Sequence, residues 1–292
     1  MNRELALPDG RQLEYRVSGP TAGLPLVFHH GTPGGAPPYR ALEAAAHARG
    51  LRFVTPARPG YGASTPLPGR AVVDVVADTA ALLEALGATR CLVAGWSGGG
   101  PHAFACAARL PGTAAALVIG GVAPHAAAGL DWLAGMGEDN LTEFGAALEG
   151  EAPLRALLDR WGWALGQITP EGIVAALSSL LPPADRRVLA GAFSEDLAAG
   201  FHEGLRNGIE GWLEDDLAFV KPWGFETDEL AVPVSLWHGE SDLMVPLAHG
   251  RWLAETVPGA AAHLVPDAGH LSVGLEHLDE ILDELVGKGR PH

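Results

Sequence analysis

The sequence predicts an α/β protein in which helices cover a mostly parallel β-sheet. Three observations support this fold class. Short, continuous apolar runs such as 24–28 and 114–119 are typical of strands that are buried on both faces. Segments with apolar residues at helical spacing separate these runs, so strands and helices alternate from the N-terminus to about residue 120. After a long stretch without a strand-like run, the alternation resumes near Val232 and continues into the C-terminal part.

The individual elements can be assigned in order along the chain. Residues 4–7 and 12–17 flank Asp9-Gly10, a strong turn signal, and predict an antiparallel hairpin at the start. Gly50 and Gly87 mark the ends of two predicted helices, because glycine readily adopts the backbone conformation that ends a helix. The further strands are predicted over 24–28, 52–55, 91–94, 114–119, 232–237 and 262–265. The helices are predicted over 39–49, 71–86, the alanine-rich segment after residue 99, 246–255 and 272–286.

The composition is typical of a globular protein, since 48% of the 292 residues are hydrophobic and 18% are charged. No apolar run reaches the roughly 20 residues that a membrane span needs. The N-terminus lacks the basic-then-apolar layout of a signal peptide, so we expect a cytoplasmic protein without a membrane partner. In that location Cys91 and Cys106 are expected to be core residues rather than a disulfide.

The charge of the chain excludes some classes of partner. The formal net charge is −16, and lysine occurs only at Lys221 and Lys288. Nucleic acids and anionic membrane surfaces are bound through clustered basic residues, so we expect neither as a partner. Between residues 126 and 227 the chain has 17 acidic and 6 basic residues, which concentrates the negative charge in one segment.

That acidic segment also divides the chain into three parts. We expect the core of the fold in residues 1–125 and 228–292, and a mainly helical cap over 126–227. Five of the eight tryptophans lie in the cap, and we expect one or two of them to face a substrate pocket. The alternative is that these are simply the next helices of the main domain, but about 100 residues is too long for a single crossover.

One motif in the core carries a candidate nucleophile. The predicted strand over 91–94 runs directly into Gly95-Trp96-Ser97-Gly98-Gly99, and a predicted helix follows. An abrupt turn from strand to helix leaves one residue at its apex with an exposed side chain, and only small neighbours allow the two elements to come so close. We therefore predict Ser97 as the nucleophile. The alternative is a glycine-rich turn beside an ordinary surface serine.

A serine hydroxyl needs a base, and the usual base is a histidine held by a carboxylate. His270 follows the last predicted strand, and Asp242 follows the strand before it. Loops at the carboxyl ends of parallel strands gather at one edge of the sheet, so Ser97, Asp242 and His270 are expected to meet there. Asp267 and Glu240 are the alternative orienting acids.

With these residues in place, the chain resembles the α/β-hydrolase superfamily over about residues 10–125 and 230–285. The resemblance rests on the motif around Ser97, on His30-Gly31-Thr32-Pro33, on Asp242 and His270, and on the turn from Arg58 to Gly62, before which the superfamily often has Asp where this chain has Ala57. It implies the α/β-hydrolase fold with a cap. It also implies an oxyanion hole made by the backbone N–H groups of Thr32 and Gly98. We expect His29 and His30 to support this loop rather than to bind a ligand.

The resemblance implies a cofactor-independent serine hydrolase that cleaves a small or medium carboxylic ester through an acyl-enzyme. The alternatives are an aminopeptidase similar to proline iminopeptidases, a thioesterase, a C–C bond hydrolase, or a ligand-binding protein on a hydrolase scaffold. Relatives that use an aspartate nucleophile are excluded by Ser97. The sequence has no His-Glu-x-x-His or paired-cysteine motif, so we expect no metal. The acidic cap favours a neutral or cationic small-molecule substrate over an anionic one.

Overall fold

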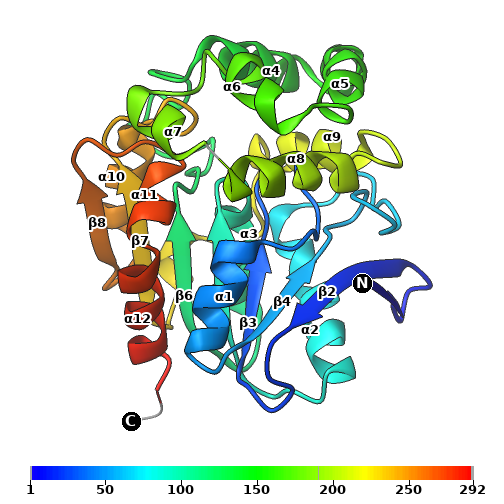
Figure 1. Ribbon diagram of the computed structural model, residues 1–292, viewed down its shortest axis with the longest axis vertical. Coiled ribbons are helices and arrows are strands. Elements are labelled where there is room, and N and C mark those ends of the chain that lie inside the picture. Colours follow the sequence, from blue (N-terminus) through cyan, green and yellow to red (C-terminus); the bar gives the residue numbers. More distant parts are fainter. Residues whose placement is uncertain (1, 190, 291–292) are drawn as a thin grey trace.

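One eight-stranded β-sheet forms the centre of the molecule (Figure 1). The computed structural model describes residues 2–189 and 191–290. The strand order is β1-β2-β4-β3-β5-β6-β7-β8. Strand β2 runs antiparallel to both of its neighbours, β1 and β4, and the pairs from β4 to β8 are all parallel. The strands are β1 (Arg3–Ala6), β2 (Gln12–Ser18), β3 (Pro25–His29), β4 (Arg52–Pro56), β5 (Cys91–Trp96), β6 (Thr113–Ile119), β7 (Val234–Gly239) and β8 (Ala261–Val265). The predicted mostly parallel sheet and its opening hairpin are confirmed.

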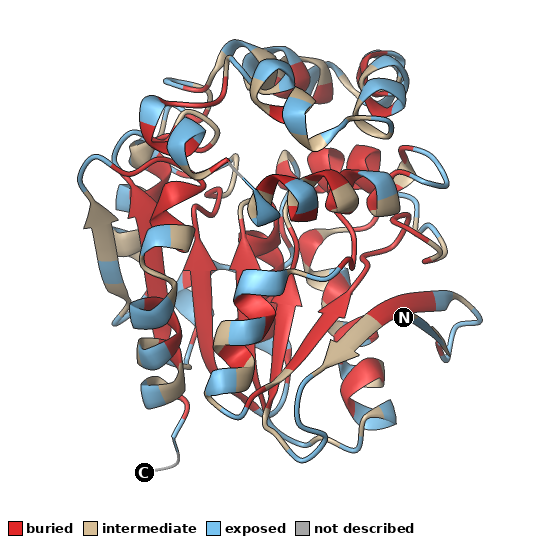
Figure 2. Ribbon diagram, in the orientation of Figure 1, coloured by how far each residue is buried: buried red, intermediate tan, exposed pale blue. Residues whose placement is uncertain are grey.

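Helices cover both faces of this sheet. Side chains alternate between the faces of a strand, so Leu26 and Phe28 of β3 enter one hydrophobic cluster while Val27 enters the other. Figure 2 shows the inner strands buried along their length. The helices of the first face are α1 (Arg40–Ala48) and α12 (Leu278–Lys288), and those of the second are α2 (Val75–Ala85), α3 (Gly99–Arg109) and α10 (Leu247–Thr256).

Three predicted boundaries were wrong in detail. The helix expected over 71–86 begins as a 3₁₀ turn, η1 (Val72–Asp74), before α2. The helix expected over 272–286 is two helices, α11 (Ser272–Glu276) and α12, because the backbone of His277 (φ −114°, ψ 16°) leaves the helical range. The strand expected from Val232 begins at Val234, since Pro233 has no N–H to offer a neighbouring strand.

The described chain between β6 and β7 contains helices and no strand. These helices lie over the carboxyl ends of the central strands in Figure 1. Helix α9 is buried from Gly211 to Phe219, so it is part of the interior rather than a surface element. The elements are α4 (Glu138–Glu149), α5 (Glu151–Leu165), η2 (Pro170–Gly172), α6 (Ile173–Ala176), α7 (Pro183–Val188), α8 (Ala192–Gly204), α9 (Glu210–Phe219) and η3 (Thr227–Glu229).

Two expectations drawn from composition can be compared with the structure. Cys91 and Cys106 are both buried and free, as predicted for core residues. Within residues 2–189 and 191–290, no helix combines the length and the apolar character needed to cross a bilayer.

Candidate active site

Ser97 lies at the sharp turn between β5 and α3. Its φ angle is 58°, a left-handed conformation that non-glycine residues rarely adopt. The turn is fixed by Ser97 N–H, which donates to the carbonyl of Ile119 at 2.8 Å. A Cβ atom added to Gly99 would lie 2.7 Å from the carbonyl carbon of His29, and one added to Gly95 would lie 2.5 Å from the carbonyl carbon of Gly99. Both glycines are therefore required by the close approach of α3 to the sheet, as the motif predicted.

His270 and Asp242 come together from two neighbouring loops. His270 follows β8, Asp242 follows β7, and the His270 Nδ1 lies 2.7 Å from the Asp242 Oδ2. The other carboxylate oxygen, Oδ1, accepts from the backbone N–H groups of Met244 and Val245, each at 2.8 Å. These bonds fix the carboxylate, which in turn directs the imidazole. The alternative acids Asp267 and Glu240 are both exposed.

The surroundings of His270 set its protonation. Burial alone would lower the pKa of His270, but the charge of Asp242 and the hydrogen bond to it raise the pKa above its ordinary value. The nearby His238 has its pKa lowered, chiefly by burial, so it stays neutral. The His270 backbone is held by Trp96, whose indole Nε1 donates to its carbonyl at 3.1 Å.

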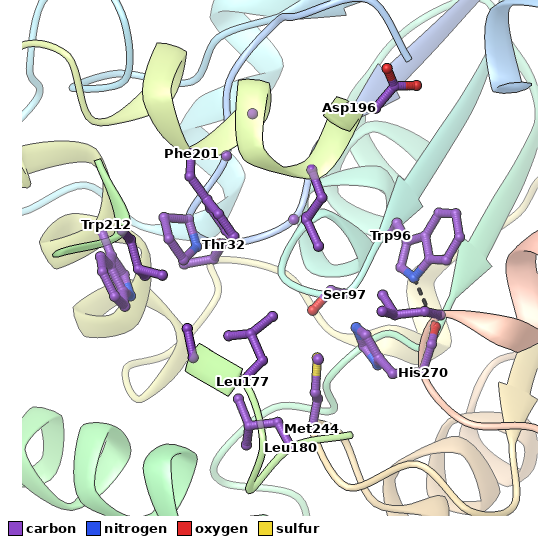
Figure 3. Close-up of a pocket in the computed structure, with 18 of the residues that line it drawn as sticks. Thr32, Trp96, Ser97, Leu177, Leu180, Asp196, Phe201, Trp212, Met244 and His270 are labelled. Atoms are coloured by element: carbon purple, nitrogen blue, oxygen red, sulfur yellow. Dashed lines mark hydrogen bonds between the residues drawn. The ribbon is translucent and has the colours of Figure 1, made fainter. Parts of the chain in front are cut away.

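Ser97 and His270 line the same cavity, which has a volume of about 430 Å³ (Figure 3). No hydrogen bond joins the Ser97 hydroxyl to the imidazole among the described residues. Such bonds often tighten only when a substrate is bound. Most of the lining is apolar and comes from the helices over the sheet, for example Leu177, Leu180 and Phe201.

The tryptophans between β6 and β7 differ in where they lie. Trp161 and Trp212 line the cavity, which confirms the expectation that one or two would face it. Trp132 and Trp223 are buried elsewhere, and Trp163 is 74% exposed. Of the five, only Trp161 and Trp212 are thus placed to contact a molecule in the cavity.

Three carboxylate side chains line the cavity. Asp139, Glu143 and Asp196 line it, and no lysine or arginine is among its described lining residues. Glu143 accepts a hydrogen bond from the indole Nε1 of Trp212 at 2.6 Å. Burial raises the pKa of Glu143, and burial together with the charge of Glu143 raises the pKa of the adjacent Asp216 well above its ordinary value.

Thr32 and Gly98 lie against each other beside Ser97. A Cβ atom added to Gly98 would lie 2.8 Å from the Thr32 Cβ. Within residues 2–189 and 191–290, neither backbone N–H donates to another protein group. The two predicted oxyanion donors are thus neighbours in space.

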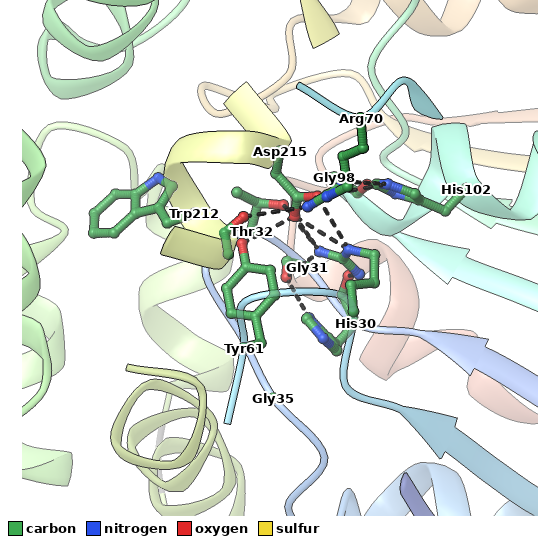
Figure 4. A network of polar contacts seen from close by, with 12 residues as sticks. His30, Gly31, Thr32, Gly35, Tyr61, Arg70, Gly98, His102, Trp212 and Asp215 are labelled. Atoms are coloured by element: carbon green, nitrogen blue, oxygen red, sulfur yellow. Dashed lines mark hydrogen bonds and ion pairs between the residues drawn. The ribbon is translucent and has the colours of Figure 1, made fainter. Parts of the chain in front are cut away.

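A buried ion network lies behind the Thr32 loop (Figure 4). Asp215 of α9 accepts from Arg58 at 2.5 Å, from Arg70 at 2.6 Å, from the Tyr61 hydroxyl at 2.9 Å and from the Thr32 hydroxyl at 2.7 Å. The side chains of Arg58 and Asp215 are fully buried. Burial alone would raise the pKa of Asp215, but the two guanidinium groups hold it well below its ordinary value. The network therefore ties α9 to the loop that carries Thr32.

The guanidinium group of Arg58 also binds the backbone of the Thr32 loop. It donates to the carbonyl of His30 at 2.6 Å and to that of Gly31 at 3.1 Å. Burial, assisted by the charge of Arg58, lowers the pKa of His29 to about 3 and that of His30 well below its ordinary value, so both rings are neutral. His30 donates through Nδ1 to the carbonyl of Gly31 at 2.8 Å, as expected of a residue that supports the loop.

With this geometry described, comparison with known proteins identifies the family. Residues 26–284 match the model of the alpha/beta hydrolase family. The chain belongs to this family. A pimeloyl-[acyl-carrier protein] methyl ester esterase of Aromatoleum aromaticum is 32% identical over 256 residues, which cover 84% of this chain and 90% of that protein.

One more distant relative and one solved structure extend this comparison. A proline iminopeptidase of Xylella fastidiosa is 26% identical over an alignment that covers 95% of this chain and 93% of that protein. Among solved structures, a thermophilic esterase from Thermogutta terrifontis has a TM-score of 0.69 and 20% identity, with 100% of both chains covered. This last likeness shows the fold alone.

Two residues of the alpha/beta hydrolase that contact the site were missed by sequence reasoning. Asp215 binds the Thr32 loop, and Asp185 of α7 binds the loop that carries His270. Both lie in the acidic segment, and their neighbours in the sequence do not distinguish them from acidic residues that face solvent. Arg58 belongs to the turn on which the family resemblance rests, but the sequence did not show that its partner is Asp215.

Proposed function

We propose that this alpha/beta hydrolase cleaves a small or medium carboxylic ester through an acyl-enzyme, with Ser97 as the nucleophile, His270 as the base and Asp242 as its orienting acid. One observation carries the proposal. Ser97 opens from its strained turn onto the same cavity as His270, whose Nδ1 is 2.7 Å from Asp242. An activated serine requires a histidine at the same site whose other ring nitrogen is held by a carboxylate.

The proposed reaction begins when the Ser97 Oγ attacks the ester carbonyl carbon and its proton passes to the Nε2 of His270. The carbonyl oxygen becomes an oxyanion that accepts hydrogen bonds from the N–H groups of Thr32 and Gly98. The C–O bond then breaks, and the leaving alkoxide takes the proton from His270. A water molecule attacks the acyl-enzyme in the same way, releases the acid and restores Ser97. The scheme needs no cofactor and no metal.

The lining and volume of the cavity indicate the class of substrate. Its apolar lining suits an acyl or alkyl group of modest size, and a volume of about 430 Å³ lies within the range of small-molecule sites. An anionic substrate would meet no lysine or arginine among the described lining residues, so a neutral or cationic substrate is favoured. We propose that residues 126–227 act as the cap that supplies this wall, and the esterase relative supports ester cleavage.

An aminopeptidase is the second candidate. The observation in its favour is the relative named a proline iminopeptidase, whose likeness extends over 95% of this chain. Both candidates use the same nucleophile and base, so they differ only in the bond that is cleaved.

The test is a panel of p-nitrophenyl esters of graded acyl length beside proline p-nitroanilide, combined with labelling by a fluorophosphonate probe. We expect turnover of the short or medium esters and a single label. Turnover of the anilide alone would establish the aminopeptidase instead. An unlabelled protein that hydrolyses nothing in the panel would overturn the enzymatic proposal in favour of a ligand-binding role.

A further inference from the structure

A fully buried carboxylate of the segment over the sheet binds the loop that carries His270. Asp185 of α7 accepts four hydrogen bonds from this loop. One oxygen, Oδ2, accepts from the backbone N–H of His270 at 2.8 Å. The other, Oδ1, accepts from the N–H of Leu271 at 3.0 Å and from the N–H and hydroxyl of Ser272, each at 2.8 Å. Every protein group that Asp185 contacts in this way therefore belongs to the His270 loop.

The sequence of the loop is adapted to this contact. A Cβ atom added to Gly269 would lie 2.5 Å from both carboxylate oxygens of Asp185, so a larger residue would push the carboxylate away. Ser272 also accepts from the N–H of Gly269 at 2.8 Å, which closes the loop around the carboxylate. Leu271 is buried in a small apolar cluster with residues of the helices over the sheet, including Leu181 and Leu189.

No lysine, arginine or histidine side chain forms an ion pair with Asp185 among the described residues. Its charge is stabilised only by N–H and O–H donors of the loop. A buried carboxylate is costly unless its hydrogen bonds are satisfied, so the loop and the carboxylate depend on each other for their positions.

We propose that Asp185 is a positioning residue for His270: it holds the backbone of the base, while Asp242 holds the ring, and it adds a second negative charge beside the base. The inference rests on the proposed function, since it takes His270 as the base. It means that α7, which is remote in sequence from the residues proposed to react, directly contacts one of them.

Among residues 2–189 and 191–290, three charged or titratable groups face His270. Asp242 contacts its Nδ1, His238 lies behind Asp242 with its Nε2 3.7 Å from the Asp242 Oδ2, and Asp185 binds its backbone N–H. His238 is neutral, so both charges near the imidazole are negative. The charge of Asp185 acts in the same direction as that of Asp242, because it also raises the pKa of His270.

The decisive variant is Asp185→Asn. The amide oxygen can keep the three donors at Oδ1, but the NH₂ group then faces the N–H of His270, so the bond to the base is lost together with the charge. We expect kcat for an ester substrate to fall about 10- to 100-fold with KM little changed, since a small displacement of a catalytic group costs this much. We also expect the acid limb of the pH profile of kcat/KM to move to lower pH.

The control is Asp267→Asn, which removes one charge from the exposed part of the same loop. The pKa of His270 is measured directly by NMR on histidine-labelled protein, with the His270 signal identified by its loss in His270→Gln. We expect a lower pKa in Asp185→Asn and little change in Asp267→Asn. A structural role alone would reduce activity without moving this pKa. Equal pKa and kcat values in wild type and Asp185→Asn overturn the inference.

A second variant covers the case in which Asp185→Asn does not fold. Gly269→Ala keeps every polar group and displaces the carboxylate by the contact described above. We expect a smaller fall in kcat and a shift of the His270 pKa in the same direction; an unchanged pKa overturns the inference. Failure of the proposed function is separate, because it appears as a wild-type protein that neither hydrolyses esters nor reacts with the fluorophosphonate, while the NMR titration still reports on Asp185.

Discussion

The residues proposed to react and the residues that hold them come from two different regions of this hydrolase. Loops at the ends of β5, β7 and β8 carry Ser97, Asp242 and His270. The helices between β6 and β7 contribute two fully buried aspartates: Asp185 binds the loop that carries His270, and Asp215 binds the loop that carries Thr32.

The difference between the two regions lies in what stabilises their polar groups. In the strand loops, Asp242 and His270 are buried and bonded to each other, and Ser97 and His270 line the cavity. Asp185 is satisfied by N–H and O–H donors alone, whereas Asp215 faces the two guanidinium groups of Arg58 and Arg70. We therefore expect substitutions in the strand loops to remove activity while the free energy of unfolding stays nearly unchanged. Substitutions of the buried aspartates should lower the free energy of unfolding and displace the loops that they hold.

The largest effect is expected for Ser97→Ala. If the strand loops supply the chemistry, this variant loses about 10⁶-fold in kcat, as the loss of the nucleophile does in other serine hydrolases, and it no longer reacts with a fluorophosphonate. Its unfolding midpoint should stay near that of wild type. The exposed Ser241, beside Asp242, provides the matched control: Ser241→Ala should retain both label and turnover. If the Ser97→Ala protein were still labelled, the nucleophile would have to be a different residue.

The next largest effect is expected for Asp242→Asn. An orienting carboxylate is worth on the order of 10⁴-fold in kcat in related triads, because its loss leaves the imidazole in the wrong tautomer. Asp267→Asn should behave like wild type, since Asp267 is exposed. Steady-state kinetics on one ester compares the two variants, and the reverse ranking would assign the acid to Asp267.

Asp215→Ala should show most clearly that the helical region contributes to stability. It leaves Arg58 and Arg70 buried without their counter-charge, so the free energy of unfolding should fall by about 3–5 kcal/mol. Activity should fall as well, because the Thr32 hydroxyl loses its acceptor. Urea unfolding measures the change, with exposed Asp159→Ala on α5 as the control. A stability loss equal to that of the control would mean that the network contributes little.

The pH dependence tests the charges around the base. His270 acts only when neutral, and its pKa is raised above the ordinary 6.5. As pH falls through that pKa the imidazole takes up a proton, so kcat/KM should decline along an acid limb whose midpoint lies above 6.5. In Asp242→Asn the limb should move to lower pH. An acid limb below 6.5 in wild type contradicts this description of the site.

The smallest effect is expected from the charge of the helical segment. A neutral ester should be preferred over a matched ester with a remote carboxylate at low salt, and added salt should reduce the preference, because salt screens the field around the entrance. Several acids of the segment, including Glu214, Asp215 and Asp216, are buried, so we expect a change of only a few fold. A preference for the carboxylate ester, or a ratio that salt leaves unchanged, would show that this charge does not govern access.

The sequence by itself determined the sheet, the turn at Ser97 and the chain order of the candidate triad. Apolar runs and helical spacing are local properties, and the glycines around Ser97 reflect a steric requirement that the neighbouring residues reveal. His270 and Asp242 follow successive strands, and parallel strands end at one edge, so their meeting could be expected before any distance was known.

Only the tertiary structure decided which charges of the acidic segment are interior. The run Glu214-Asp215-Asp216 is typical of a solvated helix face, yet α9 buries all three residues against the core. Arg58 and Arg70 lie 157 and 145 residues before Asp215, and the donors to Asp185 lie 85 to 87 residues after it. Whether a charge is buried depends on partners that the fold brings to it, and no pattern of neighbours in the sequence records them.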